Sequence, residues 1–264
     1  MSLDLHTLTA AVYLAASVLA TLGLALRRAA FSRSAVAALA AGVVLHAVAF
    51  FESPTFALPP RNAGLPGAVD LAAWLGTLVF LGLVRRARLH ALAVLVAPAA
   101  FLGVFFGSFA LDPASLQSRA DAPAWAHAHV LLASAGFALL GVAGAAGLLY
   151  LAQHRSLKRK TRLGGRAILP PLEALDRVNV FTVSVGFLLL SLALVTGVLW
   201  THATTGVVWP RSPHANAALV AWAIYAALVG ARFLARQGAA QSARSAAAGF
   251  AFLVLAVVGV GVWP

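Results

Sequence analysis

The sequence predicts an all-α membrane protein in which eight helices cross the bilayer and both termini lie on the outer, periplasmic side. Of its 264 residues, 62% are hydrophobic and 10% are charged, a composition unlike that of a water-soluble domain. One span needs about 20 apolar residues. The chain offers eight such stretches, which leave no room for a soluble domain, so we expect one membrane domain over residues 1–264: Leu8–Leu26, Ala35–Phe51, Ala68–Val84, Leu89–Leu111, Ala124–Ala152, Val178–Trp200, Ala215–Leu234 and Ala246–Trp263.

The basic residues predict the orientation of the chain. When the connections are assigned to alternate sides of the membrane, Arg61, Arg119 and Arg211 fall on one side and 16 of the 19 Lys and Arg residues fall on the other. The positive-inside rule then places both termini outside. The 16 inner residues are Arg27, Arg28, Arg33, Arg85, Arg86, Arg88, Arg155, Lys158, Arg159, Lys160, Arg162, Arg166, Arg177, Arg232, Arg236 and Arg244.

This orientation also accounts for the net charge of +12, since the inner basic residues attract anionic lipid. We therefore expect the lipid bilayer as a partner and no nucleic acid, and we expect a multi-pass protein of the bacterial inner (cytoplasmic) membrane. The acidic start at Asp4 and the pair Arg27-Arg28 after the first stretch are the reverse of a cleavable signal peptide. The first stretch should therefore remain as the first span.

Polar residues are sparse in the first three spans. The first is predicted to be a packing helix, and the second contains His46. An imidazole inside a span is a functional candidate because it needs a partner, although a backbone carbonyl could supply one. At the start of the third span, Asp70 fits a residue that interacts with the helix dipole, and Trp74 fits an interface anchor.

The fourth span contains a proline and a GxxxG motif. Pro98 predicts a kink, and the spacing of Gly103 and Gly107 predicts close approach of a neighbouring helix. Neither feature indicates a particular function.

Two histidines open the fifth span. His127 and His129 follow Trp125, and residues two apart on a helix point to different sides, so we expect only one of these imidazoles to face inward. Glycines then leave a narrow face on which a flat molecule or, more commonly, another helix could lie. They are Gly136, Gly141, Gly144 and Gly147.

The loop before the seventh span combines aromatic, basic and imidazole groups, among them His202, Trp209 and His214. An interfacial aromatic belt is one explanation. Clustering of the histidines is the argument for function, because the predicted topology places six of the eight near the outer face. The six are His6, His46, His127, His129, His202 and His214.

The side chains available restrict the chemistry. The chain has no cysteine, which excludes thiolate metal sites and disulfides. Histidines from different helices in an aromatic setting fit bis-imidazole haem ligation. Zinc binding and a proton relay through histidine are the alternatives. No Ser-His-Asp order, phosphate loop or pair of intramembrane carboxylates supports a hydrolase, an ATPase or an ion-coupled transporter.

Several segments carry a resemblance to a known family. Best preserved is the region from the fifth to the seventh span: His129 to Leu151, Pro170 to Arg177, Gly186 to Trp200, and Trp222 to Tyr225 with Arg232. This pattern resembles the integral-membrane cytochrome c assembly family, which includes the CcsA-type synthase subunit and shorter HemX- and YpjD-type relatives. The tryptophan-rich signature of the synthases is degenerate here, with matches at Trp209, Pro213 and Trp222.

The resemblance implies a set of site residues. The first outer haem-ligating histidine of the family falls on His129, and in the shorter branch a histidine like His46 recurs in the second span. We therefore expect His46 and His129 as axial ligands of a b-type haem, with His127 and His214 as further candidates. The expected pocket walls are Trp125, Trp209 and Trp222.

Two functions follow from this set. In the first, the protein handles haem in cytochrome c assembly as an accessory or delivery component. A complete synthase is not expected, because the tryptophan-rich signature is degenerate. The expected partner is another assembly subunit of the membrane. In the second, it is a haem-free scaffold or a regulator of haem synthesis, and it contacts another membrane protein through the glycines of the fifth span and the basic inner loop that follows. Transport or proton relay is a third possibility.

Overall fold

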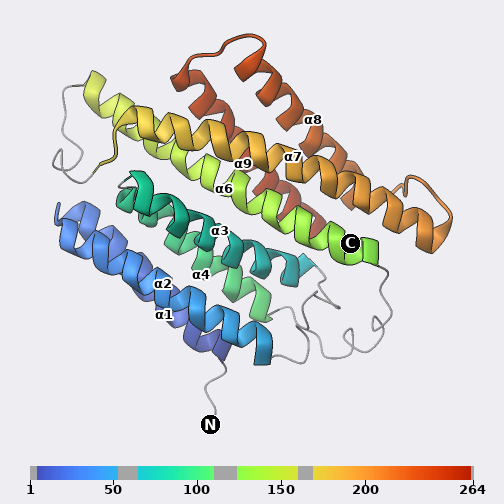
Figure 1. Cartoon of the computed structure of the whole chain (residues 1–264), viewed down its shortest axis with the longest axis horizontal. Helices are drawn as coiled ribbons and strands as arrows, with labels where there is room; N and C mark the ends of the chain where they lie inside the picture. Colours follow the sequence, from blue (N-terminus) through green and yellow to red (C-terminus); the bar gives the residue numbers. More distant parts are fainter. Residues whose placement is uncertain (1–4, 53–64, 88, 110–123, 160–168, 263–264) are drawn as a thin grey trace.

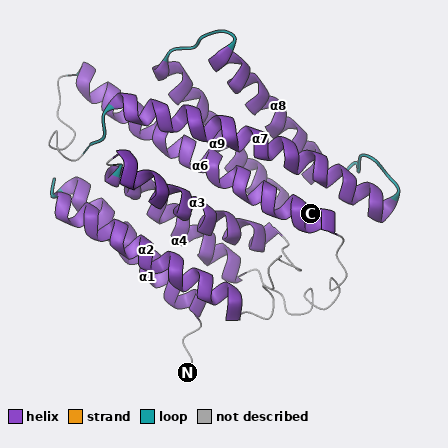
Figure 2. Ribbon diagram, viewed as in Figure 1, coloured by secondary structure: helices purple, strands orange, loops and turns teal. Residues whose placement is uncertain are grey.

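The computed structural model describes residues 5–52, 65–87, 89–109, 124–159 and 169–262. These ranges form helices and contain no strand (Figure 2). Eight of the described helices are long and apolar enough to cross a bilayer, which confirms the predicted all-α, eight-span class. The elements are α1 (Leu5–Ala25), α2 (Ala29–Glu52), α3 (Leu65–Ala87), η1 (His90–Leu92), α4 (Ala93–Phe109), α6 (Ala124–Lys158), α7 (Leu172–Thr205), α8 (Pro213–Phe233) and α9 (Ala239–Val262).

Two helices are longer than the sequence predicted. α6 has 35 residues and α7 has 34. At 1.5 Å per residue each measures about 50 Å, whereas the hydrocarbon core is about 30 Å thick. Both therefore continue beyond the lipid, because polar turns at their ends extend the same helical backbone. Some sequence predictions concern positions outside the described residues: the span ends Leu111 and Trp263, and the basic residues Arg61, Arg88, Arg119, Lys160, Arg162 and Arg166.

Consecutive spans run in alternate directions (Figure 1). α1, α3, α6 and α8 therefore begin at the end of the bundle where α2, α4, α7 and α9 finish. We call this end the histidine-rich end, because His6, His46, His127, His129, His202 and His214 lie on the helix segments nearest to it. The opposite end, the basic end, carries most of the described arginines. Which end faces the periplasm stays a prediction from the basic residues.

The helices form two groups that meet along α3 and α6. α1 packs against α2 and α4, while α6 packs against α7 and α9. α3 contacts both α2 and α6 and so lies between the two groups (Figure 1). The largest apolar core joins residues of both groups, including Tyr13, Phe80 and Leu175. α8 contacts α7 and α9 at the edge of the bundle, and its membrane-spanning window is only 11% buried.

The glycines of α6 are used for packing within the bundle. A Cβ atom at Gly136 would lie 3.1 Å from the backbone nitrogen of Leu190 in α7. A Cβ at Gly147 would lie 2.6 Å from the carbonyl oxygen of Ala243 in α9. Gly141 and Gly144 similarly face Phe250 of α9. The interpretation of this face as a helix-packing surface is therefore confirmed.

The GxxxG motif of α4 also provides close helix approach. A Cβ at Gly103 would meet Ala73 of α3, and one at Gly107 would lie 2.7 Å from the Cβ of Asp70. The predicted close approach is confirmed, and its partner is α3. Gly107 in addition provides the space for a carboxylate.

Replacement of Gly147 by Ala should destabilise the bundle by about 1–3 kcal/mol, because the new methyl group has to displace the backbone of α9. Gly82→Ala is the matched control, since a Cβ there meets nothing within 4 Å and Ala favours a helix by roughly 0.5–1 kcal/mol over Gly. Thermal unfolding in detergent measures both. Equal melting temperatures for the two variants would show that the contact between α6 and α9 is not tight.

Candidate functional site

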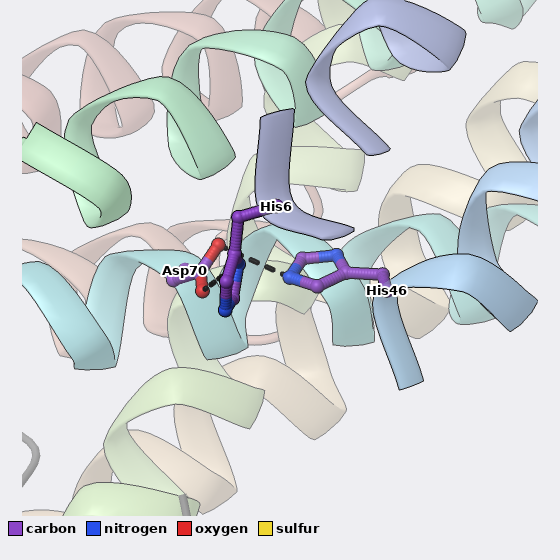
Figure 3. Close-up of side chains that lie close together, drawn as sticks. All are labelled: His6, His46 and Asp70. Carbon is purple, nitrogen blue, oxygen red and sulfur yellow. Dashed lines mark hydrogen bonds and ion pairs between the residues drawn. The ribbon is translucent and has the colours of Figure 1, made fainter. Parts of the chain in front are cut away.

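Three polar side chains from three helices meet inside the histidine-rich end. His6 lies in the first turn of α1, His46 lies six residues before the end of α2, and Asp70 lies five residues after the start of α3. Because these helices alternate in direction, the three positions fall at similar depth. Figure 3 shows the two imidazoles pointing toward the carboxylate. We call this group the His–Asp cluster.

The contacts within the His–Asp cluster are short. Nε2 of His46 lies 3.1 Å from Oδ1 of Asp70, and Nδ1 of His6 lies 4.0 Å from Oδ2 of the same residue. The other ring nitrogen of His46, Nδ1, lies 3.4 Å from the hydroxyl oxygen of Tyr13. Without a bound ion, His46 Nε2–H donates to Asp70, and the Tyr13 hydroxyl donates to Nδ1. His46 is thus held at both nitrogens.

The surroundings of the cluster are apolar and closely packed. His46 and Asp70 are 0% and 3% exposed. Phe50 stacks on the His46 ring at a centroid distance of 4.5 Å, and Trp74 packs edge-on against Phe50. The indole N–H of Trp74 donates to the carbonyl of Val43 at 3.1 Å. Trp74 therefore connects α3 to α2 beside the cluster.

A buried carboxylate requires a positive partner, because transfer of an isolated charge out of water costs many kcal/mol. In the described part of the chain, the ion pairs of Asp70 are those with His6 and His46. A protonated imidazole or a bound cation can therefore compensate its charge. The sequence interpretation of Asp70 as a helix-dipole residue was wrong, because Asp70 lies beyond the first turn of α3.

The role of Asp70 and His6 was missed at the level of sequence. One signal was present: Asp70 is an acidic residue within an apolar segment, and such residues are functional candidates in membrane spans. His6 precedes the apolar stretch that was taken as the first span, whereas α1 begins at Leu5. Because the helix starts about one turn earlier than predicted, His6 is buried in the bundle and does not lie in the terminal segment.

A cavity of about 170 Å³ lies between α6, α7 and α8 at the same end of the bundle. We call it the His129 cavity. Imidazole, indole and hydroxyl groups line it together with aliphatic side chains: His129, Leu194, Gly197, Val198, Trp200, Thr201, Trp209, Pro210, Ser212, His214 and Ala215.

One ring nitrogen of His129 makes a hydrogen bond to the backbone of α7. Nδ1 lies 2.7 Å from the carbonyl oxygen of Ala193 in α7, so Nδ1–H donates and the lone pair of the ring is on Nε2. The ring lies over Gly197, where a Cβ would be 2.9 Å from Nδ1. Trp200 packs near it at a centroid distance of 5.9 Å. These contacts fix both the tautomer and the orientation of His129.

The opposite wall of the cavity comes from the start of α8. Ser212 caps this helix, and its hydroxyl oxygen accepts a hydrogen bond from the backbone N–H of Ala215 at 3.2 Å. α7 ends at Gly206, whose positive φ of 71° suits glycine. The short connection between these caps places Trp209 and His214 beside His129.

The structure does not bring together all the residues expected at one site. His46 contacts α1 and α3, whereas His129 contacts α7, and α3 lies between α2 and α6. Of the expected pair, His46 therefore belongs to the His–Asp cluster and His129 to the separate His129 cavity. The imidazole that lines the same cavity as His129 is that of His214.

Of the expected tryptophans, Trp209 lines the His129 cavity. Trp222 lies further along α8, where its indole N–H donates to the Ser191 hydroxyl at 2.9 Å. Trp125 is exposed, and His127 and Trp125 are outside the lining of the cavity. The expectation that His127 and His129 face different sides agrees with this lining.

The chain is similar to known proteins over most of its length. The family model for "Cytochrome C assembly protein" matches residues 62–264. Proteins named cytochrome c biogenesis protein CcsA are similar to it. That of Prochlorococcus marinus (strain MIT 9303) is 29% identical over 217 residues, or 71% of this chain and 68% of the relative. The protein of Synechococcus sp. (strain CC9605) is 30% identical over 215 residues, which cover 71% of this chain and 70% of the relative. The protein of Guillardia theta is 26% identical over 195 residues, which cover 66% of this chain and 64% of the relative.

Replacement of Asp70 by Ala should destabilise the protein by roughly 1–3 kcal/mol, because Nε2 of the buried His46 loses its partner. Asp176→Ala is a suitable control. Asp176 also lies in a helix and pairs with Arg232 at 2.8 Å, but the two side chains are 23% and 20% exposed, so its loss should cost less. Chemical or thermal unfolding in detergent compares the two variants, and a larger loss for Asp176→Ala would contradict the prediction.

Proposed function

This chain belongs to the cytochrome c assembly protein family and has a role in cytochrome c biogenesis, and we propose that it handles haem at the His129 cavity. It is a multi-pass membrane protein, and the cavity lies at the end of the bundle that the basic residues predict to be periplasmic. A delivery role at that face fits a family that acts in cytochrome c assembly.

The observation that carries this proposal is the hydrogen bond from His129 Nδ1 to the Ala193 carbonyl. Histidines that bind metals commonly donate the second ring N–H to a backbone carbonyl or a carboxylate, which fixes the tautomer and makes the ligating nitrogen more basic. His129 has this arrangement before any ligand is present, so that its Nε2 is suited to hold iron.

The residues around His129 fit a haem group. His214 contributes a second imidazole to the same cavity, and Trp200 and Trp209 contribute flat apolar walls. The residues that would hold the haem iron are therefore His129 and His214, in place of the expected His46 and His129. Since the chain has no cysteine for a thioether bond, the haem would be b-type. When bound, it would supply an iron held by imidazole, which suits carriage and electron transfer rather than oxygen activation.

The size of the cavity favours transient handling. Its volume of about 170 Å³ is smaller than the roughly 300–1,000 Å³ of pockets that enclose drug-sized ligands. The protein would therefore enclose only part of the haem and leave the rest accessible to a recipient. His214 is exposed at the start of α8. An exposed ligand suits a protein that has to release the haem again.

Further aspects of the function are also proposals. We place the protein in the bacterial inner membrane, as an accessory of the shorter HemX- and YpjD-type branch that acts beside another assembly subunit. The haem-free scaffold alternative is not favoured. It required the glycines of α6 to contact a partner, whereas Gly136 and Gly147 pack against α7 and α9 of the same chain.

His129→Ala should raise the dissociation constant for haem by at least about tenfold, which corresponds to about 1.4 kcal/mol of binding free energy. The measurement is the Soret absorbance of the detergent-solubilised protein after titration with haemin. Added imidazole should restore part of this absorbance, since it can enter the space left by the side chain. His202→Ala is the control, because His202 is exposed at the same end but is not part of the cavity lining. A wild type without a Soret band, or equal spectra for both variants, would overturn the proposal.

Gly197→Ala should weaken haem binding without removing a ligand, because the added methyl group pushes the His129 ring away from Ala193. The loss should be smaller than for His129→Ala and should not respond to added imidazole. Gly259→Ala in α9 is the control, since a Cβ there meets nothing within 4 Å. Unchanged haem affinity in Gly197→Ala would show that the position of the ring does not matter.

A further inference from the structure

We propose that the His–Asp cluster is a binding site for one divalent transition-metal ion, separate from the haem site. The ligands are one imidazole nitrogen from His6, Nε2 of His46 and a carboxylate oxygen of Asp70. Two imidazoles and one carboxylate form a donor set that Zn²⁺ and Fe²⁺ both accept. We take Zn²⁺ as the reference ion.

The distances agree with a site that closes on an ion. One ligand atom from each of the three residues lies within 4.8 Å of the others. A tetrahedral zinc ion with bonds of about 2.0–2.1 Å needs ligand atoms about 3.3 Å apart. His46 Nε2 lies 3.1 Å from Oδ1 of Asp70, and His6 Nδ1 lies 4.0 Å from Oδ2. The three side chains would therefore have to adjust by an ångström or so to bring one atom each onto the ion.

The charges also favour a cation. Asp70 supplies a carboxylate at a depth of about 7 Å from the start of α3, at 1.5 Å per residue. Apart from Arg211, the described arginine and lysine residues lie toward the basic end, and the ion pairs of Asp70 in the described part of the chain are with His6 and His46. A divalent ion would compensate the charge of the carboxylate, with a net +1 left over, and would use the lone pairs of two neutral imidazoles, so that no imidazole needs to be charged in the apolar interior.

Tyr13 provides the supporting contact that a metal-binding histidine requires. Its hydroxyl oxygen lies 3.4 Å from Nδ1 of His46. When Nε2 binds the ion, the ring proton is on Nδ1 and is donated to the Tyr13 oxygen, an arrangement common around ligating histidines. Glycines make room for the groups involved, because a Cβ at Gly42 would overlap the Tyr13 ring and one at Gly107 would crowd Asp70.

The site belongs to a part of the protein that is separate from the haem-handling region. His6 and His46 precede residue 62, where the family match begins, whereas Asp70 lies within the match. The cluster joins α1, α2 and α3, while the His129 cavity is lined by residues of α6, α7 and α8. A bound ion would connect α1, α2 and α3. Because it binds the folded state, it would raise the stability of the bundle, by an amount that grows with the logarithm of its concentration above the dissociation constant.

The test uses the full-length protein in detergent, treated with a chelator and then titrated with Zn²⁺ by calorimetry. Wild type should bind one equivalent, and Co²⁺ in its place should give the visible absorption bands of a low-symmetry site. His46→Ala and Asp70→Asn should each weaken binding by more than the roughly 10- to 100-fold typical of losing an outer-shell partner. Asp70→Asn retains the size of the side chain, so its loss of binding does not depend on a cavity.

His154→Ala is the control, because His154 lies toward the basic end of α6 and stacks on Tyr150. It should bind Zn²⁺ as the wild type does. His129→Ala should also leave Zn²⁺ binding unchanged, and Asp70→Asn should leave the Soret band unchanged, which separates this site from the haem site. No zinc binding by the wild type, or equal affinity in Asp70→Asn and His154→Ala, would overturn the proposal. Either result would leave the haem assignment intact.

Discussion

The structure depends on one constraint: a polar side chain inside the bilayer must find its partner on a neighbouring helix, since no water is present to supply it. His46 meets this requirement with Asp70 and Tyr13, and His129 meets it with the carbonyl of Ala193. Each contact requires two helix axes to approach closely. The polar residues therefore determine which helices lie side by side, while the apolar residues determine only that the helices are in the membrane.

Glycine makes these approaches possible. Each candidate site has a glycine where a Cβ would collide with a functional group, at Gly107 opposite Asp70 and at Gly197 opposite His129. The same residue type serves ordinary packing along α6, at Gly136 and Gly147. In sequence the two uses look the same, because spacing shows which face a glycine occupies and not which side chain faces it.

The fold could be predicted from the sequence because hydrophobic length is a local property. Apolar stretches located all eight spans, whereas the ends of α6 and α7 were missed, since a helix that leaves the lipid does not end there. The site could be predicted only in part. His129 and His214 were among the predicted candidates, but that both line one cavity depends on how α6, α7 and α8 pack, which is not local. Asp70 was assigned to a helix end because its partner lies on another helix.

The two proposed sites share the histidine-rich end, yet they would differ in how firmly they hold a ligand. In the His–Asp cluster every ligating side chain is buried and lies within a helix, so a bound ion would exchange slowly and act on stability. In the His129 cavity only His129 is held firmly, while His214 is exposed at the first turn of α8. α8 is also the least buried span. A helix at the edge of the bundle can shift without disturbing the core, so the group it helps to hold can be released, and release is what delivery to another protein requires.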